Sequence, residues 1–213
     1  MREARFLSAA VLFALAFSGC VSVSESPTPR YYMPPSLARG EEAPKFEIAP
    51  DMIIAVGPVN IPEYQDRPQI VTKNKSGTLD FAQFERWAEP LDEALARMIS
   101  DDLAIMLPGA NFQLFPCSFS ILLDYQVIVD VLGIDSELSK DLALTAQWSV
   151  IDRKNKRMLM TKRSEFSQPV DPHNYSGLSR ALGAACAALS KEIAENLATL
   201  SKSVRPGLEP TAL

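Results

Sequence analysis

The sequence predicts an α+β fold, a two-layer sandwich in which two amphipathic helices cover one face of a mostly antiparallel sheet. Between residues 119 and 166, three segments alternate apolar and polar residues, as strands with one buried face do. Residues 90–106 and 175–200 instead carry apolar residues three and four positions apart, so each predicted helix has one apolar stripe to bury. With 213 residues the chain has room for one domain and its appendages.

The first 19 residues are typical of a secretory signal peptide. Two arginines precede an apolar run at residues 6–17, which is too short to span a bilayer as a helix. The small pair Ser18-Gly19 lies directly before Cys20 and resembles a lipobox, in which the cysteine carries diacylglycerol and palmitate and becomes the mature N-terminus. We therefore expect Cys20 to be a lipid attachment site. The alternative is an ordinary signal peptide that ends beside a cysteine.

Acyl chains, rather than surface charge, are expected to hold the protein at a membrane. Cleavage before Cys20 leaves 19 basic and 25 acidic residues, a net charge of −6, and such a body has no footprint for nucleic acid. Each buried CH₂ group contributes about 0.8 kcal/mol to membrane affinity, so a multiply acylated cysteine anchors durably. The residue after Cys20 is Val21 and not aspartate. In this respect the chain resembles lipoproteins that are sorted to the outer membrane and face the periplasm.

Residues 20–50 have the composition of a Pro/Ser-rich tether. The segment 30–33 interrupts it as a candidate first strand, which leaves a free leash from Cys20 to about Pro29. At about 3.1 Å per residue, this leash reaches roughly 30 Å. We expect residues 51–200 to form the folded domain and residues 201–213, which have no apolar period, to form a loose tail.

Residues 53–71, IIAVGPVNIPEYQDRPQIV, predict a strand that leaves its sheet at a series of prolines. Each proline removes a backbone donor and keeps the preceding residue out of the helical region. We expect a strand at residues 53–59, incompletely paired, and an extended edge or polyproline-like loop from about Ile61.

The remaining elements follow from their periods. A helix is expected to begin near Pro90 and to stop at Pro108-Gly109. The predicted strands are residues 119–131, 142–150 and 158–166, with a hairpin turn at 152–157, and the last helix runs from about Tyr175 to Leu200.

Two motifs carry a resemblance to a known family. Residues 56–71 and the RWAEPL sequence at residues 86–91 resemble the PqiC (YmbA-like) family of ABC-type transport auxiliary lipoproteins, with Gln65 as a departure from the family's leucine. The resemblance implies a non-enzymatic outer-membrane lipoprotein of an MCE/Pqi-type intermembrane lipid transport system. It would dock the periplasmic conduit at the outer membrane and support membrane integrity. The implied partners are an MCE-domain protein, inner-membrane permease-like subunits and further copies in a homo-oligomer.

The two motifs also supply candidate partner contacts, because aromatic and arginine side chains are common interface anchors. The alternative is structural, with Asp66 and Arg67 pairing with the helix start to fix the loop. The candidates are Tyr64, Asp66, Arg67, Arg86 and Glu89.

A basic cluster at the predicted hairpin turn is the local exception to the acidic balance. It either meets anionic headgroups or an acidic partner, or forms a solvated tip that protects a sheet edge. Its members are Arg153, Lys154, Lys156 and Arg157, and Lys162 and Arg163 follow on the next strand.

Residues for catalysis or metal binding are not evident. The single histidine, His173, lies in a predicted exposed loop without the neighbouring ligands that zinc needs. Nucleophile-elbow, Walker and GxGxxG motifs are missing, so we expect no enzyme, metal or cofactor.

Cys117 and Cys186 either pair in an oxidising periplasm or remain free thiols. A lipid-binding periplasmic carrier with its own apolar pocket is the alternative function, although two helices and one sheet can bury each other fully.

Overall fold

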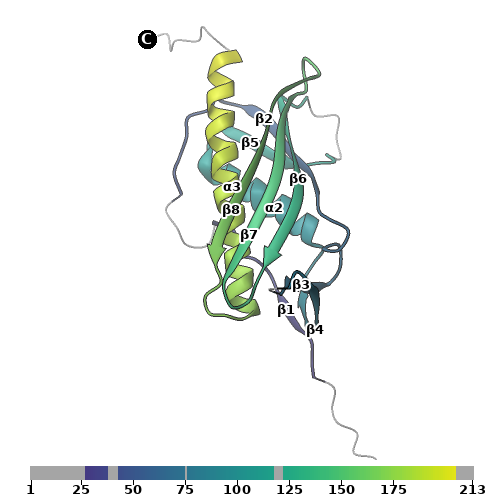
Figure 1. The fold of residues 1–213 in the computed structure, drawn as a ribbon. Coiled ribbons are helices and arrows are strands. Elements are labelled where there is room, and N and C mark those ends of the chain that lie inside the picture. Colours follow the sequence, from purple (N-terminus) through teal and green to yellow (C-terminus); the bar gives the residue numbers. More distant parts are fainter. Residues whose placement is uncertain (1–26, 38–42, 75, 118–121, 205–213) are drawn as a thin grey trace, which may run out of the picture.

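The computed structural model describes residues 27–37, 43–74, 76–117 and 122–204. Two helices pack against mixed, mostly antiparallel sheets, so the predicted α+β class is confirmed (Figure 1). Cys20, the signal segment and the end of the expected tail lie outside the described residues. The elements are β1 (Arg30–Tyr32), β2 (Met52–Asn60), β3 (Gln69–Lys73), β4 (Leu79–Trp87), α2 (Leu91–Met106), β5 (Ala110–Leu114), β6 (Tyr125–Ser136), β7 (Asp141–Asp152), β8 (Arg157–Pro169) and α3 (Tyr175–Val204).

The strands form two sheets rather than the single one expected. A five-stranded sheet has the order β5-β2-β6-β7-β8, and a three-stranded sheet has the order β1-β4-β3. The antiparallel meander β6-β7-β8 confirms the period-2 predictions, and α3 packs on β7 and β8 while α2 packs on β2 and β5. The fully buried side chains of Trp148, Leu103 and Leu182 show that sheet and helices share one core.

The predicted proline-rich strand is β2, and it lies inside the large sheet. It pairs in parallel with β5 and β6 up to Val56, and from Val59 onward with β6 only. The ladder shifts at Gly57, whose φ of 115° suits glycine and whose Cα faces the Phe115 carbonyl so closely that a Cβ would lie 3.2 Å from that oxygen. Incomplete pairing of this strand is therefore confirmed.

The predicted start of the strand at residues 119–131 was wrong. The strand expected from Phe119 begins at Tyr125, because Asp124 ends the preceding segment by bonding to the start of β2. Its backbone N–H donates to the Ile53 carbonyl at 2.8 Å, and its carboxylate accepts from the Ile53 N–H at 2.8 Å. Residues 118–121 lie outside the described part of the chain.

Both helices start where the sequence places them, but α3 ends later than expected. Asn174 caps α3, its side-chain oxygen accepting from the Gly177 N–H at 2.9 Å. Residues 201–204 are helical rather than part of a loose tail, and Ser201 is buried. No helix in the described ranges is long and apolar enough to cross a membrane.

The molecule has two distinct ends (Figure 1). The small sheet and the beginning of α3 lie together at one end, where the rings of Tyr32 and Tyr175 are 6.3 Å apart. The β7–β8 turn and the C-terminal part of α3 lie at the opposite end, where Lys154 and Ser201 line one small cavity. We call the first the tether end, because the chain leading from Cys20 enters the fold at β1. We call the second the hairpin end, after the β7–β8 turn.

Candidate functional site

Most of the predicted contact residues meet in one hollow at the tether end. Its volume is about 420 Å³. It contains four of the five candidates, whereas Tyr64 lies elsewhere, with its hydroxyl beside Gly133 of β6. We call it the arginine hollow; it is lined by Tyr31, Asp66, Arg67, Pro68, Arg86, Trp87, Ala88, Glu89 and Pro90.

Strand pairing brings these distant segments together. Arg86 of β4 lies opposite Gln69 of β3 on one side and opposite Tyr31 of β1 on the other. The Trp87 N–H then donates to the Pro68 carbonyl at 2.8 Å, which closes the proline-rich loop against the end of β4. The hollow therefore lies where the two sequence motifs and the incoming chain meet.

The β1 strand is fixed to this site by a buried carboxylate. Arg30 Nε lies 2.9 and 3.0 Å from the two carboxylate oxygens of Glu85, and Arg30 also forms an ion pair with it. These hydrogen bonds hold the pKa of the Glu85 carboxyl below its ordinary value. At neutral pH Glu85 is thus charged, and β1 is tied to β4.

The charged groups of the arginine hollow are unevenly partnered. Arg67 stacks on Phe81, with its guanidinium carbon 4.4 Å from the ring centroid. Glu89 is ion-paired with Arg97 of α2. Asp66 and Arg67 form no ion pair with the helix start in the described part of the chain, so the loop-fixing pair that was the structural alternative is not formed there. The loop is held instead by cation–π stacking and backbone bonds.

Two donors in the hollow have no acceptor. Arg86 Nε and Trp87 Nε1 are buried without a hydrogen-bond partner among the described residues. Trp87 and Tyr31 were missing from the predicted set. The RWAEPL motif marks Trp87, but nothing in the sequence places Tyr31 beside Arg86, because β1 joins β4 only in the folded chain.

The predicted basic cluster lies at the hairpin end and is partly neutralised. Lys154 forms an ion pair with Asp124, and Arg157 Nε lies 4.0 Å from the Asp152 carboxylate. Hydrogen bonds from Asn155 hold the pKa of Asp152 below its ordinary value. Within the described ranges the ion pairs leave Arg153 and Lys156 as the exposed, unpaired cations of the turn.

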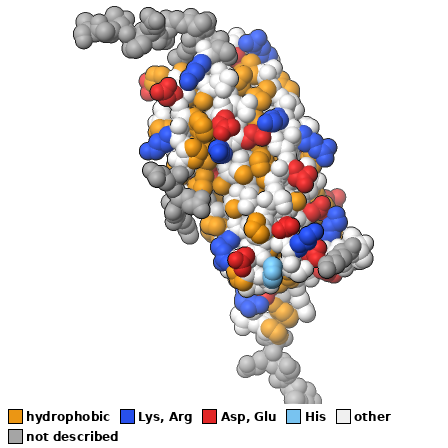
Figure 2. Space-filling view, turned by 60° about the vertical axis from the view of Figure 1, so that its left-hand side comes forward, with side chains coloured by type: hydrophobic (Ala, Val, Ile, Leu, Met, Phe, Trp, Pro, Cys, Tyr) orange, Lys and Arg blue, Asp and Glu red, His pale blue; other side chains and the backbone are white. Residues whose placement is uncertain are grey.

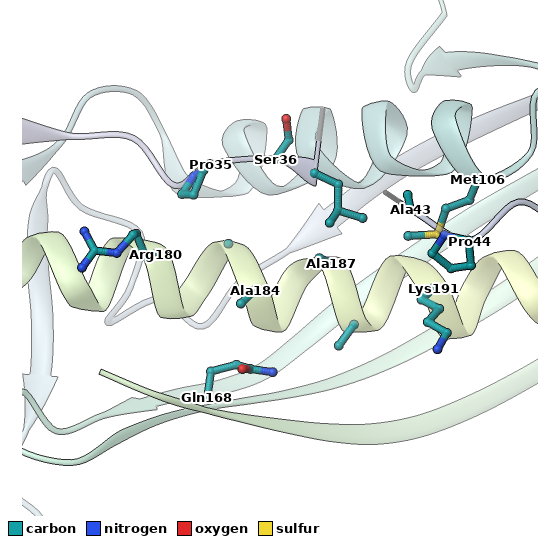
Figure 3. A pocket seen from close by; sticks show the side chains of 13 residues that line it. Pro35, Ser36, Ala43, Pro44, Met106, Gln168, Arg180, Ala184, Ala187 and Lys191 are labelled. Atoms are coloured by element: carbon teal, nitrogen blue, oxygen red, sulfur yellow. The ribbon is translucent and has the colours of Figure 1, made fainter. Parts of the chain in front are cut away.

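A second hollow, of about 640 Å³, lies beside α3 (Figure 3). Pro35 and Ser36 lie on one side of it and Ala184 and Ala187 of α3 on the other, while Lys191 points away from them. Figure 2 shows apolar side chains between charged ones on this side of the molecule. Four of the six α3 residues that line it are glycine or alanine. We call this hollow the α3 groove.

The remaining candidates, two cysteines and one histidine, do not line the arginine hollow or the α3 groove. Cys117 and Cys186 are free thiols, so the disulfide alternative is not present. Cys186 is fully buried in α3, and burial raises the pKa of its thiol. His173 is exposed in the loop before α3, as predicted.

Comparison with known proteins gives a family and a fold. Residues 36–194 match the family model described as ABC-type transport auxiliary lipoprotein component. No functionally curated protein matches the chain. The crystal structure of an uncharacterized protein is 19% identical with a TM-score of 0.65, covering 80% of this chain and 99% of that one. A Xanthomonas campestris protein of the DUF330 family model is 14% identical with a TM-score of 0.66, covering 83% and 99%. At these identities the two structures show a shared fold only.

Proposed function

This chain belongs to the family of ABC-type transport auxiliary lipoprotein components, and from that premise we propose that it anchors and docks a lipid-transport conduit at the outer membrane. The match over residues 36–194 is the observation that carries the proposal. The conduit would be of the MCE/Pqi type, built from an MCE-domain protein and inner-membrane permease-like subunits. The family is one of transport auxiliary lipoproteins, not of enzymes.

The shape of the molecule supports a positional mechanism. The chain from Cys20 enters at β1, so an acylated Cys20 would hold the tether end at the membrane. The hairpin end, with exposed Arg153 and Lys156, would then face the periplasm. A basic surface in that position suits an acidic partner better than the headgroups of the membrane that carries the anchor.

Two experiments test this proposal separately. Labelling cells with a palmitate analogue tests the anchor, because Cys20→Ser would abolish labelling and release the protein from outer-membrane fractions. Purification of the tagged, acylated protein from a membrane extract tests the partner, because an MCE-domain protein should be recovered with it. Recovery should fall when Arg153 and Lys156 are changed to glutamate and should persist with Lys140→Glu, which is exposed on the β6–β7 turn. Absence of palmitate labelling would contradict the proposed anchor. A purification without any MCE-domain protein would contradict the proposed docking.

The α3 groove favours one alternative, a lipid-binding carrier. Its volume of about 640 Å³ lies in the range of ligand pockets, roughly 300–1,000 Å³. Its lining is mostly apolar, and it lies outside the closed core between sheet and helices. Native mass spectrometry separates the two functions. A monomer that retains phospholipid supports the carrier, and a lipid-free oligomer supports docking.

A further inference from the structure

The arginine hollow contains polar groups that the fold itself does not use. Trp87 is 6% exposed, and its indole N–H has no acceptor. Arg86 Nε lies in the same lining and is also buried without a partner. A buried donor without an acceptor costs about 1–3 kcal/mol. Glu89 Oε1 lines the same hollow and is a third buried polar atom without a hydrogen-bond partner, although its carboxylate is ion-paired with Arg97. Unsatisfied polar atoms gathered in one hollow indicate a site that a ligand completes.

The charges around these donors define the class of ligand. Arg86 and Arg67 provide guanidinium groups, which suit phosphate oxygens because of their fork geometry. Two carboxylates also line the hollow. Glu89 is paired with Arg97, whereas Asp66 is exposed and has no ion pair among the described residues. A ligand with a phosphate and a nearby ammonium group would satisfy both signs of charge.

The position of the hollow indicates where that ligand comes from. Tyr31 lines the hollow and lies about ten residues after Cys20 in the sequence. An extended leash of that length spans roughly 30 Å. Three large apolar side chains are exposed on the same small sheet and the chain that leaves it. They are Tyr31 at 63%, Met33 at 54% and Phe81 at 48%. Aromatic and apolar side chains beside a polar hollow are the composition of a membrane–water interface.

We propose that the arginine hollow binds the headgroup of a zwitterionic phospholipid, of the phosphatidylethanolamine class, in the membrane that holds the lipid anchor. Arg86 and the Trp87 indole donate to the phosphate, Arg67 adds positive charge, and Asp66 meets the ammonium group. Both donors are shielded from water, so binding includes a turn of these two side chains toward the phosphate. The inference rests on the proposed anchoring at the outer membrane and gives the tether end a ligand.

The two tryptophans make a direct test. The acylated protein, labelled with ¹⁵N at tryptophan and held in an uncharged maltoside detergent, should give one indole N–H resonance from Trp87 and one from Trp148. Trp148 Nε1 already donates to Glu192 at 2.9 Å, so its resonance is an internal reference. Titration with glycerophosphoethanolamine or dihexanoylphosphatidylethanolamine should move the Trp87 resonance saturably downfield and leave that of Trp148 in place.

Matched variants and probes identify the source of the phosphate. Arg86→Gln should weaken binding by about tenfold or more, because a charge-assisted hydrogen bond is lost. Arg153→Gln removes a guanidinium at the hairpin end, away from the arginine hollow, and should leave binding by the hollow unchanged. Asp66→Asn should reduce the preference for the phosphoethanolamine probes over dihexanoylphosphatidylglycerol. Unchanged thermal unfolding of each variant shows that the fold is intact.

Several outcomes would overturn the inference. These are no saturable movement of the Trp87 resonance with any phospholipid probe, equal binding by Arg86→Gln, or inorganic phosphate binding as tightly as the glycerophosphodiesters, which would indicate a free-anion site. The soluble glycerophosphoethanolamine arm does not depend on Cys20 acylation. A failure of the hollow is thereby distinguished from a failure of the anchor, which palmitate labelling reports.

Discussion

Glu192 is the acceptor on which three polar groups of the large sheet converge. Trp148 Nε1 donates to it at 2.9 Å, Ser164 donates to the same oxygen, and Lys162 Nζ lies 2.9 Å from the other. Burial alone would raise the pKa of Glu192, but these hydrogen bonds outweigh it and lower the pKa below its ordinary value. The carboxylate thus joins α3 to β7 and β8 and satisfies the buried indole of Trp148.

We expect Glu192→Ala to lower the free energy of unfolding at pH 7 by about 2 kcal/mol, because the Trp148 N–H is left buried without an acceptor. Since the folded pKa lies below the ordinary value of 4.5, the ionic part of this stabilisation is present above that value. It is lost as the pH falls through the folded pKa, so the difference between the two proteins should narrow there. Urea denaturation from pH 7 to below pH 4 measures it. Glu192→Gln keeps an acceptor oxygen and should lose less, and an equal loss would contradict this account.

Asp102 of α2 has the opposite electrostatic situation. Its side chain is fully buried, and burial raises its pKa to about 6. One carboxylate oxygen accepts from the Leu37 N–H at 2.9 Å, while the other has no partner among the described residues. The residue therefore ties the segment after β1 to the helices at the cost of burying a charge at neutral pH.

We expect Asp102→Asn to be more stable than the natural protein at pH 7.5 by about 2 kcal/mol. The unfolded chain releases this proton near 3.8 and the folded protein near 6, so the folded state binds more protons between those values. The contribution of Asp102 to the free energy of unfolding is fully present below pH 3.8, and it is lost as the pH rises through the folded pKa of about 6. Asparagine keeps the carbonyl for Leu37 and removes the decline. Chemical denaturation at pH 4 and pH 7.5 measures both proteins; a less stable variant at pH 7.5 would show that the carboxylate charge is required.

Gly183 sets how closely the N-terminal segment packs on α3. A Cβ at this position would lie 2.4 Å from the Pro35 carbonyl oxygen, far inside contact distance. Helix propensity alone favours alanine over glycine by about 1 kcal/mol. The close approach of Pro35 accounts for the glycine, and it places the segment so that Leu37 reaches Asp102.

We expect Gly183→Ala to loosen this segment despite its better helix propensity, with a loss of about 1–3 kcal/mol in the free energy of unfolding. The amide of Leu37 should exchange its hydrogen faster, because its bond to Asp102 is strained. Ala184→Ser, one residue on and exposed, is the control and should leave the exchange rate unchanged. Greater stability with unchanged Leu37 protection would refute the packing argument.

Long periodic elements were predictable, whereas β5 and the β3–β4 hairpin were not. The strands β6 to β8 and both helices carry enough alternating or helical positions for their type to follow from the sequence. The β5 strand has five residues, mostly exposed, so it lacks a clear period. Its parallel pairing with β2 depends on contacts between residues more than 50 positions apart, which local patterns do not encode. In the small sheet, β1 was predicted as a candidate strand at residues 30–33, whereas the β3–β4 hairpin and its pairing with β1 were not predicted.

The candidate site was predictable as a set of residues but not as a place. The two motifs marked Asp66, Arg67, Arg86 and Glu89, and the pairing of β3 with β4 brings them to one hollow. Period and composition could not show that Trp87 is buried with a free indole N–H. That property depends on how β1 and the proline-rich loop close over β4, which appears only in three dimensions.

At the scale of the whole molecule, the proposed docking function makes the length of the expected tether a variable of the mechanism. The expected leash from Cys20 to Pro29 has ten residues, and the two ends of the body differ in chemistry. Under the proposed anchoring, a short leash would keep the tether end at the membrane and the hairpin end at a defined distance from it. A long leash would let the body tumble and would lower the effective concentration of its surfaces at their targets.

We therefore expect a 30-residue Gly/Ser insertion between Ser26 and Pro27 to separate anchoring from docking. Acylation, outer-membrane fractionation and thermal unfolding should be unchanged, because Cys20 and the folded domain are intact. Effective concentration falls roughly as the −3/2 power of linker length, so a fourfold longer leash should reduce recovery of the MCE-domain partner by about eightfold. A rigid helical insertion of the same length would move the body outward and should reduce recovery further. Full recovery with both insertions would show that the lipid anchor does not position the domain, and that docking depends only on the affinity of the hairpin end for its partner.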